Sequence, residues 1–568
     1  MDRIIKSYID NFVVSQQIEE SNISTVFEMF SCYCALSKEY DENFNIDDML
    51  TGNGGDCGID GIAIILNGVL INSIDEANDI IEINKNINDL KFIFVQGKTS
   101  SNFSGSELGT FGFGVLDFFK ENPEMVRNES ITEKNKISEY LFSKAVLMKN
   151  KPKCIMYYVT TGKWTGDQNL SARINGISND LTETNLFSEV VFSPVDANLL
   201  QKYYKATIDK IERTIDFPNR IPLPEMDKIV ESYLGILPAK EYVKLITEDE
   251  EIIKSLFYDN VRDYQGENDV NQEIKATLKT RDSSKFVILN NGVTIICKEL
   301  RNIVRNQFQL SDYQIVNGCQ TSHVLYHSRQ ELNDRVFITL KIISTTDEET
   351  VNKIIKATNR QTEVTDEQML SLTDFHKKLE DFYKTFNGTK KLYYERRSKQ
   401  YATASDIEKV RIVTLPLQLK SFASMFMDKP HISSRYFGRL IKDAEGVFQE
   451  NHKLLPYYTS AFALYKLEYL FRNKQFDLKY RKYRYHILMI MKYRCLNGKN
   501  TPPLNSNDIE KLCESINEVM YDHQRFSSLV AECLQVLDKA VMDMTNTDNP
   551  RQIAIVEDLK SIAQVIDE

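Results

Sequence analysis

The stretch GGDCGIDGIAIILNGVLI, residues 54–71, and the later stretch KFIFVQGKTS, residues 91–100, decide the fold of the first part of the chain. The apolar runs IAIIL and KFIFVQG are typical of buried strands, and the glycine-rich segment before IAIIL is typical of a loop. Asn67-Gly68 stands between IAIIL and VLI. Because both residues tolerate a positive φ, we expect a two-residue β-hairpin there.

Helical and strand patterns alternate on both sides of this stretch. Val26, Phe27, Phe30 and Cys34 recur with helical spacing before the loop. After it we expect, in order, an acidic connection or short helix at 74–89, a helix at 103–120, strands at 154–162 and 190–195, and a helix from near Asp196. Such alternation favours a mixed sheet flanked by helices.

The rest of the chain has a second mixed region, followed by a helical one. The segment PNRIPLPEM interrupts regular structure near Phe217-Pro218. Beyond it, KFVILNNGVTIICKEL (285–300) predicts a hairpin that turns at Asn291-Gly292, and residues 313–332 predict a strand, a turn and a helix. Helical periodicity dominates from about residue 405. We therefore predict a mixed α/β protein with domains at 1–215, 216–430 and 431–568, the last of them helical.

Composition excludes several classes of protein. Of the 568 residues, 42% are apolar and 27% charged, and these globular proportions exclude a disordered or collagen-like chain. A net charge of −11 argues against a globally basic nucleic-acid coat, although it leaves room for a local basic groove. The nine cysteines form no CxxC pair, and no apolar run approaches the ~20 residues of a membrane helix. We expect reduced thiols, a cytoplasmic location and no membrane partner.

Charge is unevenly distributed along the chain. The first 100 residues contain 17 acidic and 6 basic side chains, a balance that equals the net charge of the whole chain. We expect this acidic block to be a solvated face, with metal-binding carboxylates as the alternative. Between Lys466 and Cys495, nine basic and two acidic residues alternate with aromatic ones. This mixture is typical of a nucleic-acid groove, although basic residues also flank core helices by snorkelling.

Asp60, Gln96 and Lys98 form the strongest candidate site. Residues two apart in a strand point to the same face, so Gln96 and Lys98 should lie side by side, where Asp60 at the mouth of another strand can meet them. Phosphodiester hydrolysis needs a hard cation held by oxygen ligands, and a positive group that orients the attacking water and offsets phosphate charge. These three side chains supply those groups. The plainer alternative is an ion pair between Asp60 and Lys98 at the strand edge.

This pattern resembles the PD-(D/E)xK nuclease superfamily, specifically its Mrr-like restriction-enzyme branch, in which glutamine replaces the acid of the last motif. The resemblance covers about residues 20–215 and implies a restriction-endonuclease-like α/β/α domain that requires Mg²⁺ or Mn²⁺ and cuts DNA. It makes Asp60 a metal ligand, Gln96 a neutral oxygen ligand, and Lys98 the residue that orients water or phosphate. By analogy with many nucleases of this superfamily, a homodimer is expected.

A neutral glutamine weakens the cation site unless another carboxylate contributes. Glu28 and Asp56 are the candidates, and Glu28 would be a further metal ligand. Each has a plainer interpretation: Thr25-Val26-Phe27-Glu28 fits a capping box, and Asp56 in GGDCG fits a turn.

A second resemblance covers the middle of the chain. The ordered blocks SLFYDNVRDYQGENDVNQEIKATL, FVILNNGVTII and YQIVNGCQTS, followed by ATNRQTEVTDEQML and LYYERRSKQY, are similar to blocks of the AIPR family, named for abortive infection and phage resistance. An Mrr-like nuclease fold before an AIPR region is an arrangement known in that family. The resemblance implies antiphage defence, with a phage-derived trigger or a defence-system partner, and a central AIPR region that senses infection or gates the nuclease.

The VNGCQTS block is a candidate anion or nucleic-acid site. A strand that enters an Asn-Gly turn and then a helix aims backbone N–H groups and the positive helix end outward. Side chains with the right chemistry to add bonds to a phosphate are Asn317, Gln320, Thr321, Arg360, Arg396 and Arg397. Alternatively, Thr321 or Ser322 simply caps the helix. We interpret His323 and His327 as ordinary helix residues, since no third metal ligand accompanies them.

Two hypotheses of function follow. In the first, the chain is an antiphage protein with a Mg²⁺-dependent DNA endonuclease domain. In the second, it is a non-catalytic sensor of nucleic acid or nucleotide that keeps a degenerate nuclease fold.

Overall fold

The structure is a computed structural model, and it describes residues 3–52, 54–248, 250–253, 256–257, 274–278, 281–358, 373–396, 400–401, 404, 407–444, 446–541 and 549–564. The chain forms two compact units. The first consists of Met1–Ile208 together with Thr373–Glu568, and the second of Asp209–Leu372. Residues far apart in the sequence thus share the first unit, whereas the three predicted domains follow one another along the chain.

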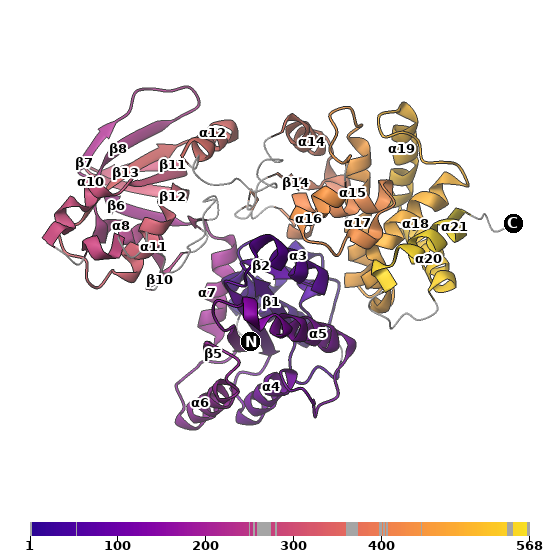
Figure 1. Cartoon of the computed structure of the whole chain (residues 1–568), viewed down its shortest axis with the longest axis horizontal. Helices are drawn as coiled ribbons and strands as arrows, with labels where there is room; N and C mark the ends of the chain where they lie inside the picture. The colour runs from indigo at the N-terminus through magenta and orange to yellow at the C-terminus, as the bar shows by residue number, and fades with distance from the viewer. Residues whose placement is uncertain are drawn as a thin grey trace. The chain divides into compact units, whose positions relative to one another are not determined.

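A five-stranded sheet forms the centre of the N-terminal part (Figure 1). Its strands are β1 (Gly61–Leu66), β2 (Val69–Ile71), β3 (Leu90–Lys98), β4 (Lys153–Thr160) and β5 (Glu189–Val195), in the order β2-β1-β3-β4-β5. The β1 strand runs antiparallel to both of its neighbours, whereas β3, β4 and β5 are parallel. The sheet is therefore mixed, as the alternation of helices and strands predicted.

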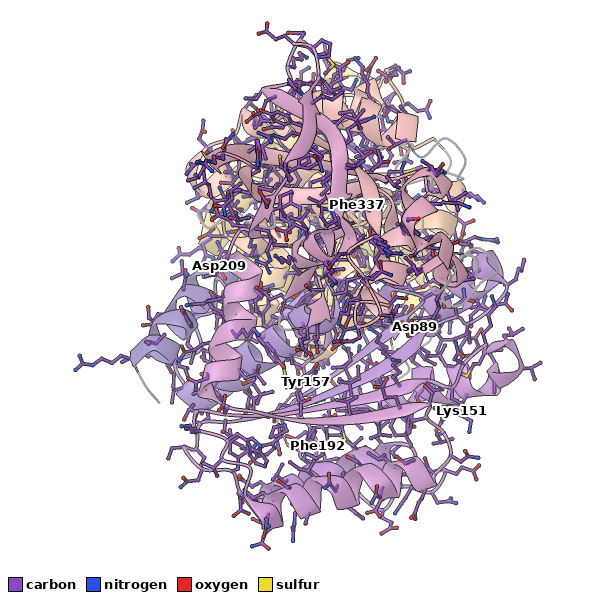
Figure 2. All side chains as sticks on the ribbon, turned by 90° about the vertical axis from the view of Figure 1, so that its left-hand side faces the viewer. Asp89, Lys151, Tyr157, Phe192, Asp209 and Phe337 are labelled. Carbon is purple, nitrogen blue, oxygen red and sulfur yellow. The ribbon has the colours of Figure 1, made fainter. Side chains whose placement is uncertain are left out.

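Helices cover both faces of this sheet, because alternate side chains of each strand enter different apolar cores. Phe92 and Phe94 of β3 pack with α3 (Ile74–Asn84), α4 (Gly105–Phe118), α5 (Glu129–Ser143) and α6 (Gln168–Glu183). Ile93 and Val95 pack on the opposite side with α1 (Arg3–Gln16), α2 (Ile23–Glu39) and α7 (Ala197–Ile208). Figure 2 shows this edge-on, with Tyr157 and Phe192 on opposite sides of the sheet. The domain is an α/β/α sandwich.

The predicted hairpin at Asn67-Gly68 is confirmed. It joins β1 to β2, and the two residues have φ values of 49° and 82°. Positive φ at both central positions is the requirement that makes Asn-Gly favourable in such a turn.

The second unit contains a six-stranded sheet in the order β6-β12-β11-β13-β8-β7. Its strands are β6 (Glu212–Asp216), β7 (Asn219–Pro222), β8 (Glu231–Pro238), β11 (Val293–Val304), β12 (Gln307–Asn317) and β13 (Phe337–Ser344). Helices α8 (Ala239–Ile246) and α11 (Cys319–His327) contribute to the core on one face, and α12 (Glu348–Thr358) packs on the other.

The predicted hairpin at Asn291-Gly292 is wrong. Residues Phe286–Leu289 form the short helix α10, and β11 pairs instead with β12 on one side and β13 on the other. A short apolar run does not distinguish a strand from a helical turn. Gly292 is required for a different reason: a Cβ there would lie 2.6 Å from the Thr339 carbonyl oxygen.

The C-terminal part of the first unit is mainly helical, as predicted. Its longer helices are α14 (Asp374–Lys384), α15 (Leu415–Phe426), α17 (Leu455–Arg472), α18 (Arg484–Leu496), α19 (Asn507–Tyr521), α20 (His523–Ala540) and α21 (Ile553–Gln564). In α18, all residues from Tyr485 to Tyr493 are buried, which makes it the central helix of this part. Within the described ranges, no helix has the length and apolarity needed to cross a membrane.

Candidate active site in the N-terminal domain

Asp60 and β3 meet at one end of the sheet. Asp60 directly precedes β1, and the pairing of Gly61 with Val95 places it beside Gln96. The Gly97 amide donates a hydrogen bond of 2.7 Å to Asp60 Oδ2, and the Asp60 amide donates one of 2.8 Å to the Val95 carbonyl. The backbone of β3 therefore fixes the position of the carboxylate.

Glu28 reaches the same end of the sheet from helix α2. The helix lies very close to β3 at Gly97, where an added Cβ would be 2.8 Å from Ser31 Oγ and 3.3 Å from Glu28 Cα. The capping-box interpretation of Glu28 is wrong, because α2 begins at Ile23 and the Asn22 side chain caps it by accepting from the Ser24 amide. Glu28 is in the second turn of the helix and is left available for the site.

Burial and neighbouring charges shift the two carboxyl groups. Burial raises the pKa of Asp60 to about 7; Lys98 acts to lower it and Glu28 to raise it further. Burial also raises the pKa of Glu28, while Lys98 acts in the opposite direction. These mutual effects show that Asp60, Glu28 and Lys98 lie close enough to interact through their charges.

Lys98 does not neutralise Asp60 by direct contact. The ammonium group of Lys98 makes no ion pair with any residue that the structure describes, so the simple ion pair at the strand edge is not found. Asp56, in contrast, is the predicted turn residue, since its Oδ1 accepts a hydrogen bond of 2.8 Å from the Gly58 amide. A half-buried cation beside two carboxyl groups, without a fixed partner, is suited to hold an anionic group or a water molecule.

Gln96 supplies a buried oxygen without a partner. Its side chain is only 3% exposed, and its Oε1 atom accepts no hydrogen bond from the described residues. A buried polar atom left unsatisfied is costly, and a bound cation would satisfy it. The side-chain oxygens of Asp60, Gln96 and Glu28 are of the kind that Mg²⁺ or Mn²⁺ prefers as ligands. The set carries few charges, because Gln96 is neutral, and the described residues contain no group of three His, Cys, Asp or Glu that could hold a metal.

Two further side chains belong to this end of the sheet, and the sequence analysis missed both. Tyr158 of β4 pairs in register with Gln96, and its hydroxyl donates a hydrogen bond of 2.8 Å to Glu107 Oε2 of helix α4. Burial and this bond, together with the charge of Asp60, raise the pKa of Tyr158. Only the register between parallel strands brings Tyr158 to Gln96, and no local sequence pattern contains that register.

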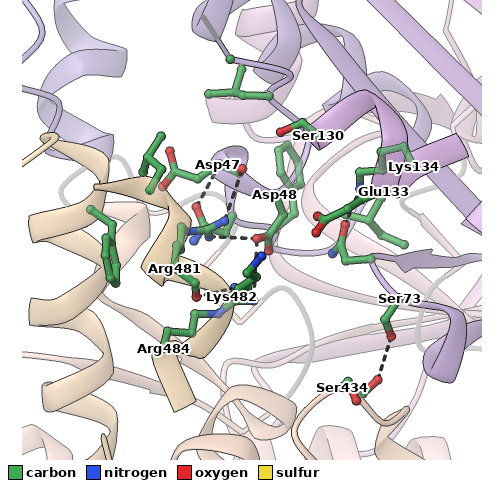
Figure 3. A pocket seen from close by; sticks show the side chains of 18 of the residues that line it. Asp47, Asp48, Ser73, Ser130, Glu133, Lys134, Ser434, Arg481, Lys482 and Arg484 are labelled. Atoms are coloured by element: carbon green, nitrogen blue, oxygen red, sulfur yellow. Dashed lines mark hydrogen bonds and ion pairs between the residues drawn. The ribbon is translucent and has the colours of Figure 1, made fainter. Parts of the chain in front are cut away.

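Asp60 and Glu28 line a cavity of about 1220 Å³ in the first unit. The opposite wall comes from the C-terminal helical part and includes Arg472, Arg481 and Arg484 of the basic segment 466–495. Acidic residues of the N-terminal block face these arginines, so the block is not simply a solvated face. Figure 3 shows Arg481 and Arg484 directed at Asp48.

The predicted anion site around VNGCQTS is assembled only in part. The strand, turn and helix are present, with Asn317 at the end of β12, Gly318 at φ 102° and Gln320 in the first turn of α11. Thr321 is buried, and its hydroxyl donates to Asn290 Oδ1 at 3.0 Å. Neither Thr321 nor Ser322 caps the helix, because the N-cap is Gly318. His323 contacts Phe257 with ring centroids 5.1 Å apart, as an ordinary helix residue would.

The predicted arginines do not complete this anion site. Arg396 belongs to the first unit, is 6% exposed, and pairs with Glu380 at 2.9 Å, so its charge is already used in a buried ion pair. Arg360 and Arg397 lie outside the described residues.

The N-terminal part is an α/β/α domain with a candidate cation site at one end of its sheet. Together with the C-terminal helical part it forms the first compact unit. A model of the AIPR protein family matches residues 257–548, which is more than half of the chain. The chain belongs to the AIPR family. This membership indicates a role in antiphage defence by abortive infection. No curated protein and no solved structure matches the chain.

Proposed function

We propose that this AIPR protein acts in antiphage defence as a metal-dependent endonuclease that hydrolyses phosphodiester bonds in DNA. The observation that carries the proposal is the meeting of Asp60, Glu28 and Lys98 with the unpartnered oxygen of Gln96 at one end of the N-terminal sheet. The family match begins at residue 257, so the proposal for the N-terminal domain rests on this geometry and on the nuclease resemblance alone.

The side chains divide the chemistry between them. Asp60 and Gln96, with Glu28 as a third ligand, would hold Mg²⁺ or Mn²⁺, which when bound supplies Lewis acidity to the scissile phosphate and to a water molecule. Lys98 would orient that water and offset the charge that develops on the phosphate oxygens. The Gly97 amide keeps Asp60 in place throughout, since it donates to Oδ2.

Cleavage of a plasmid in Mg²⁺ or Mn²⁺ tests this proposal. We expect Asp60→Asn and Lys98→Ala each to lower the cleavage rate by ~10² or more, with DNA affinity changed little, because both groups act mainly on the transition state. Lys153→Ala is a matched control, since this lysine lies on β4 of the same sheet in an exposed pair with Glu189. Cleavage by the Asp60→Asn variant at the rate of the control would contradict the proposal.

A second candidate function is binding without cleavage. It is favoured by the neutral Gln96 and by the lack of a three-residue metal group among the described residues. Under this alternative the protein binds nucleic acid or nucleotide but never cuts, whichever cation or phage lysate is added. The plasmid assay, combined with a DNA-binding measurement on the same samples, separates the two functions.

A further inference from the structure

We infer that ion pairs between the turn at residues 45–48 and the basic segment at residues 472–484 form a latch, which holds the C-terminal helical part over the Asp60 cavity and keeps duplex DNA out. The latch is an autoinhibitory contact, and its role rests on the proposed nuclease function. We call these paired residues the latch: Asp47, Asp48, Glu468, Arg472, Arg481 and Arg484.

The latch joins the N-terminal domain to the end of α17, to η8 (Leu478–Tyr483) and to the start of α18. Arg472 Nε is 3.0 Å from Asp47 Oδ2, and Arg481 Nη2 is 2.8 Å from Asp48 Oδ1. Glu468 binds Arg481 at 2.9 Å and Arg484 at 3.2 Å, which connects the pairs into one network. Asp47, Asp48 and the three arginines line the same cavity as Asp60, so the latch forms part of the wall that faces the candidate site.

These charges are well removed from water. The exposed fractions are 4% for the Arg472 side chain, 13% for Asp47, 13% for Arg481 and 20% for Asp48. Burial acts to raise the pKa of Asp48, but Arg481 and Arg484 outweigh it and lower the pKa to about 2. At Asp47, burial outweighs Arg472 and Arg481 and raises the pKa. Asp48 therefore depends most strongly on its arginines, and their loss would leave it an uncompensated buried charge.

Polar contacts also dominate the rest of this interface. Lys420 binds Glu76 at 2.9 Å, Arg435 binds Asp79 at 2.8 Å, and Lys482 binds Glu129 at 2.8 Å. The buried residues of the two apolar cores of the sheet all lie between residues 5 and 204, and Tyr436 is the one C-terminal residue packed against them within the described ranges. The helical part can consequently separate without opening either core, as polar interfaces between domains generally allow.

The size of the cavity shows why separation is needed. The major groove of one turn of B-DNA, about 34 Å long, about 12 Å wide and about 8.5 Å deep, encloses on the order of 3000 Å³. The cavity of about 1220 Å³ is smaller than that groove alone. We therefore infer that a duplex does not enter this cavity while the latch is closed, whereas the volume is sufficient for a small phosphodiester.

The test compares duplex DNA with bis(p-nitrophenyl) phosphate as substrates for the full chain. We expect Asp48→Lys, which places a third cation beside Arg481 and Arg484, to raise duplex cleavage at least about tenfold and leave cleavage of the small diester within about twofold. Hydrogen exchange of residues 45–50 and 478–484 should become at least about tenfold faster. Asp48→Glu, which keeps the negative charge beside Arg481 and Arg484, should keep slow exchange, and Glu189→Lys, at an exposed pair of the same domain, is the control.

The readouts distinguish failure of the latch from failure of the nuclease. If exchange and duplex cleavage stay at wild-type values in Asp48→Lys, the latch is refuted. If exchange rises as expected but neither substrate is ever cut, the latch exists and the proposed nuclease function fails. Unfolding of Asp48→Lys would show as faster exchange in strands β3 and β4, and the charge-neutral variant Asp48→Asn then replaces it.

Discussion

Replacement of Asp60 by asparagine should make the metal-free protein more stable at alkaline pH, although it removes the proposed catalysis. Burial is the main reason that the pKa of Asp60 lies near 7 rather than near its ordinary value of 3.8. A folded state that holds the proton more tightly than the unfolded chain loses stability as pH rises between these two values. Asparagine keeps an oxygen that can accept from the Gly97 amide, but it carries no charge to bury.

The size of the effect follows from the shift of about three pH units. At 1.36 kcal/mol per unit, ionisation of Asp60 costs the folded state at most about 4 kcal/mol, and we expect about 2–4 kcal/mol after solvent and relaxation are considered. The difference between wild type and Asp60→Asn should be absent below about pH 4, grow from pH 4 to 7, and stay constant above pH 7.

Thermal unfolding in EDTA, measured from pH 4 to 9, tests the expectation. For a unit of this size, 2–4 kcal/mol corresponds to a Tm about 2–5 °C higher for Asp60→Asn at pH 8. Addition of Mn²⁺ should stabilise the wild type and not the variant, because a ligand that binds only the folded state raises its stability. If the variant is no more stable than wild type at pH 8, the reasoning is refuted: the ionised Asp60 carboxylate would then not destabilise the metal-free folded state.

Two other substitutions test the geometry of the site. Gly97→Ala should lower the free energy of unfolding by about 1–3 kcal/mol and also slow cleavage. Its Cβ would be 2.8 Å from Ser31 Oγ and would push α2, with Glu28, away from β3. Urea unfolding measures the first effect and the plasmid assay the second. Gln96→Glu should tighten Mn²⁺ binding about tenfold in calorimetric titrations, because it adds a carboxylate to the ligand set. Unchanged stability of the first variant, or weaker Mn²⁺ binding by the second, would contradict the arrangement described above.

Local chemistry made much of the N-terminal fold predictable. The Asn67-Gly68 turn was predictable because both residues accept a positive φ. Strand β3 was predictable because its apolar run is too long to be a turn. The start of α2 was not predictable in the same way. Asn22 and Thr25 are both good capping residues, and the choice between them decides whether Glu28 serves the helix end or the site.

Long-range contacts explain what the sequence could not indicate. The proximity of Asp60, Gln96 and Lys98 was predictable because it depends on strand alternation and on one loop. The position of Tyr158 depends on the parallel register of β3 and β4, and the pairing of Asp47 with Arg472 joins residues more than 400 positions apart. The uneven distribution of charge was the one sign of that pairing, since an acidic block near the start and a basic segment near the end are individually unremarkable.

The boundary between the two units passes through the AIPR region itself. The family match covers residues 257–548, of which those up to Leu372 belong to the second unit and those from Thr373 onward to the first. Every latch residue of the C-terminal side lies in the later portion. The proposed gating of the candidate site, which the family resemblance led us to expect of the central region, would therefore act through contacts made by residues 373–548. Under this proposal the family region contributes to gating through its later portion, and opening of the site requires those ion pairs to weaken.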